Sequence, residues 1–178
     1  EVKERFTDKT ISELIKACFD MGEVKTGALI VIEQDEMLND YIRTGINLDA
    51  ILTSQLLINI FEHNTPLHDG AVIVRGNRIV AATCYLPLSD NMELSKQLGT
   101  RHRAGVGISE QTDSVTIIVS EETGQVSVAQ RGKLIRGVNS SKLREILIRA
   151  QNKQVVDNSK LRYLLKGRMK HEEEKTDR

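Results

Sequence analysis

The chain has 178 residues and a mass of 20.0 kDa, which leaves room for one domain with appendages rather than for two domains. Hydrophobic residues make up 39% and charged residues 28%, a composition that excludes collagen-like and fully disordered chains. Lys and Arg number 25 and Asp and Glu number 25, so the formal net charge is zero and we expect no nucleic-acid partner.

The first half of the chain predicts two helices and a central strand. Thr10–Glu13 has the form of a capping box, and apolar residues at helical spacing follow it, which predicts a helix over about residues 10–21. Residues 27–33 are apolar on both faces, as a strand covered by helices should be. Residues 34–47 are polar and are predicted to form a connection, and residues 48–61 return to helical periodicity.

The middle of the chain predicts a β-hairpin and two short helical pieces. Residues 71–74 and 78–84 flank Gly76-Asn77, which is a strong signal for a tight turn. A short helical piece is expected over Glu93 to Leu98, and another helix is expected to begin near Arg101.

A second hairpin and a final helix follow. Residues 114–120 and 125–129 read as strands joined by Thr123-Gly124, and Asn139 or Ser140 can cap the last helix. Helices are interleaved with strands, yet at least two strand pairs are joined by tight turns. The predicted fold class is therefore α/β, with a mixed central β-sheet flanked by helices.

The loop before the first hairpin could carry chemistry. Asp69 precedes Gly70, which can bring backbone close to a ligand, and His68 stands beside it. A carboxylate at a strand edge can hold Mg²⁺ or Mn²⁺, or accept a proton from a hydroxyl nucleophile. The alternative is an ordinary turn in which the Asp side chain bonds its own backbone.

The segment Gly99-Thr-Arg-His-Arg103 could bind phosphate. Backbone N–H groups at a helix N-terminus and the guanidinium groups can act together on phosphate oxygens. Arg101 and Arg103 point to one side if the segment is extended, but diverge if it is helical. The alternative is a solvated basic patch.

Ser120-Glu121-Glu122 forms a third, weaker candidate, at the carboxyl end of an apolar strand. Other familiar motifs are missing from the sequence. There is no Walker loop, zinc-protease His pair, serine elbow or complete dinucleotide-binding fingerprint. Cys18 and Cys84 belong to no paired motif, so neither a zinc site nor a disulfide framework is predicted, and a reducing cytosolic setting fits.

Two runs, Thr65–Val72 and Leu98–Ala104, together with the Ser-Glu-Glu strand end, closely resemble the diadenylate cyclase family of bacterial enzymes that make cyclic di-AMP. The resemblance extends over residues 26–129. It is nearest to the membrane-anchored type of Gram-positive bacteria, whose catalytic domain follows transmembrane helices. The family fold is a mixed sheet between helices, in agreement with the element pattern.

The resemblance implies condensation of two ATP into cyclic di-AMP and two pyrophosphates, with a divalent cation such as Mn²⁺, Mg²⁺ or Co²⁺. Each domain would hold one ATP, so two domains would meet face to face as a homodimer, and each 3′-hydroxyl would attack the other α-phosphate. The whole protein would be held at the cytoplasmic face of the membrane by an N-terminal segment absent from this chain. Regulatory proteins could be further partners.

The resemblance also implies three groups of site residues. The catalytic group is Asp69, Arg101, His102 and Arg103. The ATP-binding group is Gly70, Ala71, Tyr85, Leu86, Gly99, Thr100, Ser120 and Glu121, with Tyr85 and Leu86 as the adenine contacts. The metal-binding group is His68, Asp69 and Glu122.

These expectations divide the chain into three parts and leave two other functions open. Residues 1–25 would be an N-terminal helix and linker, residues 26–151 the catalytic domain, and residues 152–178 a charged tail. One alternative function is a module that senses adenine nucleotides without turning them over. A weaker one is a metal-dependent phosphohydrolase that uses His68, Asp69 and Glu122.

Overall fold

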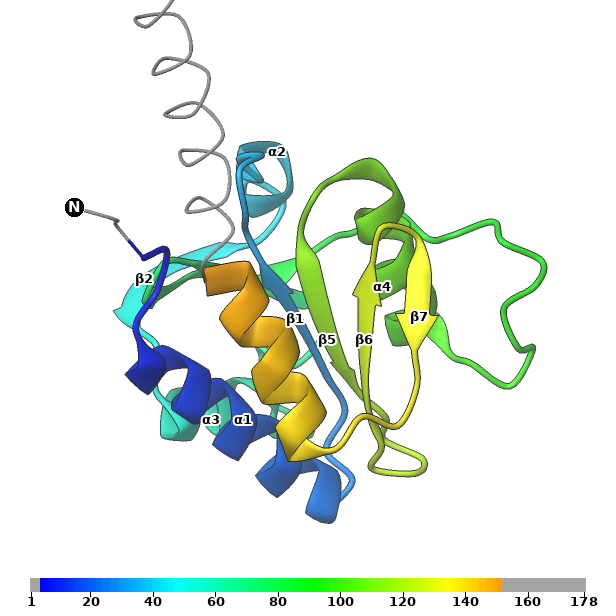
Figure 1. The fold of residues 1–178 in the computed structure, drawn as a ribbon, viewed down its shortest axis with the longest axis horizontal. Helices are drawn as coiled ribbons and strands as arrows, with labels where there is room; N and C mark the ends of the chain where they lie inside the picture. The colour runs from blue at the N-terminus through cyan, green and yellow to red at the C-terminus, as the bar shows by residue number, and fades with distance from the viewer. Residues whose placement is uncertain (1–3, 152–178) are drawn as a thin grey trace, which may run out of the picture.

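A mixed β-sheet forms the middle layer of the molecule (Figure 1). The structure is a computed structural model that describes residues 4–151, so the predicted charged tail lies outside the described residues. Within this range seven strands pair in the order β2-β4-β3-β1-β5-β6-β7. Their bounds are β1 Ala28–Ile32, β2 Ile46–Ile51, β3 Ala71–Arg75, β4 Arg78–Cys84, β5 Val115–Val119, β6 Val126–Gln130 and β7 Lys133–Ile135.

Helices cover both faces of the sheet. They are α1 Asp8–Glu23, α2 Asn39–Ile42, α3 Ser54–Phe61, α4 Thr100–Gln111, and a last one over residues 140–151. The apolar side chains of α1, α3 and the last helix join one core cluster, and those of α2 and α4 join a second cluster on the opposite face. Alternate residues of β1 enter the two clusters, as the pleat of a strand requires. The predicted α/β fold class is confirmed.

The direction of the strands brings particular chain ends together. β1 runs parallel to β3, with Ile30 opposite Val72, and antiparallel to β5, with Ala28 opposite Val119. The starts of β1 and β3 and the end of β5 therefore lie at one edge of the sheet. We call this row of strand ends the site edge of the sheet. The row of opposite strand ends, where β1 and β3 finish, is the far edge.

The first helix begins earlier than the capping box predicted. Thr7 is the N-cap of α1, and its side chain accepts a hydrogen bond from the backbone N–H of Thr10 at 3.3 Å. Thr10 itself is buried inside the helix. Glu13 bonds no cap, because its carboxylate accepts the backbone N–H of Ser54 at 2.6 Å. The capping-box assignment was wrong, and Glu13 instead joins α1 to the start of α3.

The helix predicted over residues 48–61 was wrong in its first half. There the chain forms β2, an edge strand paired antiparallel with β4, and α3 begins only after Thr53, whose hydroxyl accepts the backbone N–H of Leu56 at 3.1 Å. Leu48 and Ala50 are half-buried, which is the alternation of an edge strand. The strand carries a bulge and a positive φ at Asp49. Leu48, Ile51 and Leu52 stand at positions i, i+3 and i+4, so the apolar spacing imitates a helix.

Three smaller predictions also need correction. The connection over residues 34–47 contains α2 and the beginning of β2. The helical piece at Glu93 to Leu98 is a series of turns, because Asn91 and Ser95 side chains accept backbone N–H groups two residues further on and so compete with helical bonding. Strand β7 was not predicted.

Other predicted elements are confirmed. Gly76 adopts φ 59° in the turn between β3 and β4, and β5 and β6 form the second hairpin. Asn139 caps the last helix by accepting the backbone N–H of Lys142 at 2.8 Å. Among the helices that the structure describes, none is long and apolar enough to cross a bilayer.

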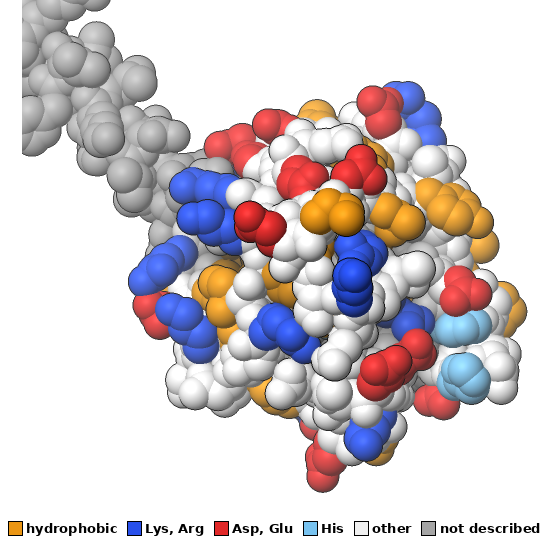
Figure 2. Space-filling view, turned by 90° about the vertical axis from the view of Figure 1, so that its right-hand side faces the viewer, with side chains coloured by type: hydrophobic (Ala, Val, Ile, Leu, Met, Phe, Trp, Pro, Cys, Tyr) orange, Lys and Arg blue, Asp and Glu red, His pale blue; other side chains and the backbone are white. Residues whose placement is uncertain are grey.

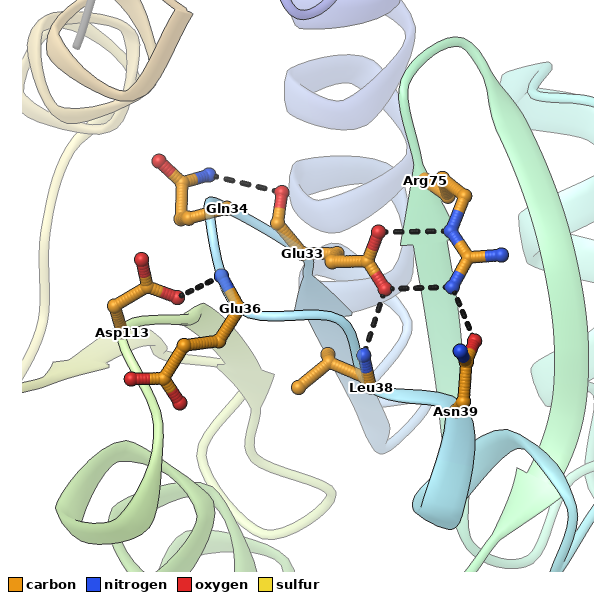
Figure 3. Close-up of polar contacts among 7 residues, drawn as sticks. All are labelled: Glu33, Gln34, Glu36, Leu38, Asn39, Arg75 and Asp113. Atoms are coloured by element: carbon orange, nitrogen blue, oxygen red, sulfur yellow. Dashed lines mark hydrogen bonds and ion pairs between the residues drawn. The ribbon is translucent and has the colours of Figure 1, made fainter. Parts of the chain in front are cut away.

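A buried ion pair closes the far edge of the sheet (Figure 3). The Glu33 side chain is only 8% exposed, and its carboxylate accepts two bonds from the Arg75 guanidinium, at 2.7 and 2.8 Å. The same carboxylate accepts the backbone N–H of Leu38 at 2.8 Å, and Arg75 donates to Asn39 at 2.7 Å. The network therefore fixes the start of α2 against the ends of β1 and β3.

We expect Arg75→Ala to destabilise the fold by about 2 kcal/mol, because it leaves the Glu33 carboxylate buried without a cation. Removing one partner of a fully buried pair costs about 3–5 kcal/mol, and the value here is smaller because Arg75 keeps some exposure. Urea unfolding measures the effect. Arg43→Ala is the matched control, because its ion pair with Asp40 is exposed and should contribute less than about 0.5 kcal/mol. Equal losses in the two variants would contradict the structural role given to the network.

Candidate functional site

Segments far apart in the sequence meet at the site edge. A Cβ atom added to Gly27, just before β1, would lie 2.6 Å from Nη1 of Arg101 in α4 and 3.2 Å from Cβ of Glu121, which follows β5. Nη1 of Arg101 lies 3.3 Å from Oε2 of Glu121. Glycine at position 27 therefore makes room for an arginine, and the start of α4 is held against the ends of β1 and β5.

Two adjoining pockets open beside this contact. The first, which we call the α4 pocket, has a volume of about 110 Å³ and is lined by residues that include Thr100, Arg101, His102, Glu121, Glu122 and Arg136. The second, the histidine pocket, has a volume of about 430 Å³ and is lined by residues that include Gly27, His63, His68, Arg101 and Glu121. Arg101 and Glu121 line both pockets, so the basic segment and the loop before β3 share one cavity system.

The N-terminus of α4 is open to an anion. Gly99 is the N-cap, no side chain among the described residues caps the helix there, and a Cβ at Gly99 would meet nothing within 4 Å. Backbone N–H groups without helical partners, together with the helix dipole, favour a negative ligand at such an end. Because α4 is helical from Thr100 onward, Arg101 and Arg103 diverge, and only Arg101 lines the two pockets.

Arg101 is held in place but is not fully bonded. Its side chain is 21% exposed and pairs with Glu121, yet its Nε is buried without a hydrogen-bond partner among the described residues. A buried donor without a partner carries a cost that a bound acceptor would remove. Arg101 is thus suited to bind an anion that enters between the two pockets.

His68 and Asp69 form an acid–imidazole pair on the loop before β3. Nδ1 of His68 lies 2.6 Å from the backbone oxygen of Thr65, and its Nε2 lies 3.4 Å from Oδ1 of Asp69. The Asp69 side chain is 88% exposed, and it does not line either of the two pockets. Figure 2 shows two histidine side chains side by side at one edge of this face with acidic side chains around them, and the rings of His63 and His68 lie 5.7 Å apart.

Gly70 lets the Asp69 loop approach the end of β4 closely. It adopts φ 84°, and a Cβ there would lie 2.9 Å from backbone atoms of Thr83 and Cys84. Only glycine meets both demands without strain. Ala71, which the resemblance placed among the nucleotide contacts, lies with its side chain fully buried in the core opposite Cys84.

Tyr85 and Leu86 follow β4 at the site edge. Tyr85 is 77% exposed, and its backbone N–H donates to the Thr44 hydroxyl at 2.9 Å. Leu86 is partly buried against the core cluster on the α4 face. The exposed Tyr85 ring and the adjacent Leu86 side chain line neither pocket. They follow Thr83 and Cys84, against which Gly70 packs.

The Ser-Glu-Glu segment shapes the α4 pocket. The Ser120 hydroxyl accepts the backbone N–H groups of Glu122 and Thr123, both at 3.2 Å, and so stabilises the turn after β5. Glu122 lines the α4 pocket and does not line the histidine pocket with His68. Among the described residues no group of three or more His, Cys, Asp or Glu side chains is arranged to hold a metal, so of the expected metal ligands only His68 and Asp69 are paired.

His102 is neutral rather than cationic near pH 7. It is 8% exposed, and burial lowers its pKa below the ordinary value of 6.5. The positive charges of Arg136 and Arg101 lower the pKa further, while Glu122 acts in the opposite direction. Its imidazole therefore offers a neutral N–H donor or ring acceptor to a ligand in the α4 pocket, without adding charge.

The sequence analysis missed several lining residues, among them Arg136 and Gly27. Arg136 follows β7, a three-residue strand that the apolar pattern did not reveal, and nothing in its neighbours marks it. Gly27 was read only as the start of a strand. Its position directly before a fully buried strand was the one signal of a close approach between the backbone there and another group.

The fold and the site together define a class. An α/β domain in which a helix N-terminus, an arginine and acidic side chains converge at one sheet edge is typical of proteins that bind nucleotide phosphates. Residues 15–134 match the model of the DAC family, described as DisA bacterial checkpoint controller nucleotide-binding. This chain belongs to the DAC family.

Similar proteins agree with this assignment. The Bacillus subtilis (strain 168) protein named cyclic di-AMP synthase CdaA is 54% identical over 165 residues, which cover 93% of this chain and 60% of that protein. The Listeria monocytogenes (strain 10403S) protein named diadenylate cyclase is 54% identical over 82% of this chain and 54% of its own length. The present chain thus spans less than two thirds of the length of these relatives.

Solved structures confirm the fold. A double mutant of DacA from Staphylococcus aureus superposes with a TM-score of 0.80 at 50% identity, covering 81% of this chain and 96% of that one. A Bacillus cereus protein described as a hypothetical membrane spanning protein gives a TM-score of 0.71 at 45% identity, covering 75% of this chain and 65% of that one.

We expect His102 to make stability depend on pH. Its folded pKa is lowered below 6.5, so as the pH falls the unfolded chain takes up the proton first. The contribution of His102 to stability is fully present above about pH 6.5 and is lost as the pH falls through the folded pKa. Urea unfolding at about pH 7.5 and about pH 5 should show a larger loss for the wild type than for His102→Gln. Identical losses would contradict the neutral assignment.

Proposed function

We propose that this chain is a diadenylate cyclase, which condenses two ATP into cyclic di-AMP and two pyrophosphates. The observation that carries the proposal is the meeting of the loop before β3 with the start of α4 at one cavity system, in a chain of the DAC family. The names of the Bacillus subtilis and Listeria monocytogenes relatives support the same reaction.

The reaction joins each nucleotide to the other. The 3′-oxygen of one ATP attacks the α-phosphorus of the second, a new P–O bond forms, and the bond from that phosphorus to the bridging oxygen of pyrophosphate breaks. The exposed Asp69 carboxylate accepts the proton of the attacking hydroxyl. The same step on the other side closes the ring, so two protons and two pyrophosphates leave for each product.

The phosphates would lie against the start of α4. Backbone N–H groups of its first turn, the Thr100 side chain and the Arg101 guanidinium stabilise the charge on the departing pyrophosphate. Neutral His102 adds a hydrogen bond. Gly70 lets the nucleotide approach the backbone, and Tyr85 with Leu86 provides an exposed ring and an aliphatic surface for the adenine.

The residues present fit a divalent cation in part. Nδ1 of His68 is bonded to a backbone oxygen, and its Nε2 faces the Asp69 carboxylate, so the two side chains could bind a metal between them. Bonding of the second ring nitrogen is common among metal-binding histidines. Oxygens of the nucleotide would complete the coordination of Mn²⁺, Mg²⁺ or Co²⁺. The cation would neutralise charge on the phosphates.

Two chains would meet face to face. The cavity system at the site edge suits one ATP, and Asp69 faces outward, where a second nucleotide could present its 3′-hydroxyl. A two-fold axis between two copies would supply both attacks with a single set of residues. A membrane location for the whole protein stays part of the proposal, supported by the description of the Bacillus cereus structure as a hypothetical membrane spanning protein.

The direct test is incubation of the purified chain with ATP and Mn²⁺ at high protein concentration, followed by mass spectrometry of the products. Cyclic di-AMP and pyrophosphate in a ratio of one to two are expected. Binding of ATP without product would contradict the cyclase and favour a nucleotide sensor, and release of free phosphate alone would favour a phosphohydrolase.

Asp69→Asn should lower the rate of cyclic di-AMP formation by about 100-fold or more, because it removes the proton acceptor and a metal ligand with little change in shape. Circular dichroism checks that the fold is kept. Asp40→Asn is the matched control, since Asp40 is an exposed carboxylate on α2 outside the site, and it should keep full activity. Unchanged activity in Asp69→Asn would remove this residue from the mechanism.

The activity per chain should fall on dilution once the two-fold assembly dissociates, because no single copy can complete both attacks. Initial rates measured over a wide range of protein concentration, beside light scattering for the assembly state, test this. A rate per chain that stays constant while scattering reports monomers would refute the face-to-face arrangement.

A further inference from the structure

Arg136 differs from Arg101 in having no carboxylate partner among the described residues. It lies between β7 and the last helix, and its side chain lines the α4 pocket together with Thr100 and His102. Glu121 and Glu122 line the same pocket, yet among residues 4–151 Arg136 forms no ion pair and donates no hydrogen bond. An arginine in a pocket without a carboxylate partner has its whole guanidinium available for another acceptor.

Arg136 and Arg101 mark different parts of the cavity system. Arg101 lies at the junction, where the α4 pocket adjoins the histidine pocket that contains His68. Arg136 lines the α4 pocket but not the histidine pocket. Both guanidinium groups act electrostatically on His102 and help to lower its pKa, so the imidazole lies within reach of both charges.

A nucleoside triphosphate has one orientation that suits this arrangement, given the proposed function. Its α-phosphorus must lie on the side of His68 and Asp69, where the hydroxyl of the other nucleotide arrives. The rest of the triphosphate then extends past Arg101 into the α4 pocket. There it meets the open N-terminus of α4 on one side and the guanidinium of Arg136 on another.

We propose that Arg136 binds the terminal phosphates of the bound nucleotide and thereby makes the site select nucleoside triphosphates over monophosphates. This inference rests on the proposed function and deepens it. A guanidinium can donate two parallel N–H bonds to phosphate oxygens, and these bonds strengthen as charge gathers on the departing pyrophosphate. Adenosine monophosphate lacks the groups that reach Arg136, so its binding should not depend on this residue.

The test compares the affinities of ATP and AMP for the full chain by isothermal titration calorimetry. Arg136→Ala should weaken ATP binding about 10- to 100-fold, the effect of losing a charged hydrogen bond, while AMP binding changes by less than about two-fold. Arg136→Lys should restore part of the ATP affinity, because a point charge replaces a forked donor. Arg136 is exposed, so its removal should leave the melting temperature unchanged.

Lys133→Ala is the matched control, because Lys133 is an exposed cation three residues before Arg136 and does not line the pocket. It should leave ATP affinity unchanged. Three results would each overturn the inference: equal effects of Arg136→Ala and Lys133→Ala on ATP affinity, equal weakening of ATP and AMP binding by Arg136→Ala, or no effect of Arg136→Ala on ATP binding. In each case, cyclic di-AMP formation by the wild type would still uphold the proposed function. A wild type that binds no ATP and forms no product would instead refute the proposed function, and the inference with it.

Discussion

The parallel pairing of β1 with β3, next to the antiparallel pairing of β1 with β5, is the constraint on which the candidate site depends. The first pairing brings Gly27 and Gly70 to one edge of the sheet, and the second adds Ser120. If β3 ran the other way, Asp69 would lie at the far edge beside Glu33. Because β1, β3 and β5 are buried on both faces, a slip of one residue would move each side chain into the opposite core cluster and disturb the packing of both.

The two edges of the sheet differ in how well their polar groups are satisfied. At the far edge, Glu33 and Arg75 bond each other and the start of α2, which leaves little for a ligand to add. At the site edge, no side chain of residues 4–151 caps α4, Nε of Arg101 is buried without a partner in that range, and Asp69 faces outward. Natural sequences break local rules of this kind mainly where function demands it. Nε of Arg5, which pairs with Asp35 after β1, is also buried without a partner among the described residues, so the uncapped start of α4 and the exposed Asp69 are what distinguish the site edge.

Much of the fold could be predicted from the sequence, because its signals are local. The hairpin at Gly76-Asn77 and the buried strands follow from turn chemistry and from unbroken apolar runs. The helix predicted from residue 48 failed because Leu48, Ile51 and Leu52 have helical spacing although the chain there forms an edge strand with a bulge. Strand β7 was missed because its three residues are too few to show a period.

The site was less predictable than the fold. The two motifs could be found, but whether Arg101 and Arg103 share a direction depended on the helix beginning at Thr100, which the sequence left open. No local pattern encodes the close approach of Arg101 to Gly27 or the position of Arg136 at the α4 pocket. Both arise from contacts between residues far apart in the chain. The pairing of His68 with Asp69, by contrast, was visible as adjacent residues.

The central claim is that the loop before β3 and the start of α4 grip one nucleotide between them. A crystal structure of the chain with a nonhydrolysable ATP analogue tests it most directly. The account predicts phosphate oxygens within hydrogen-bond distance of the α4 N-terminus and of Arg101, with the α-phosphate on the side of Asp69. A nucleotide bound on the opposite face of the sheet, against α1 and α3, or at the far edge, would contradict it.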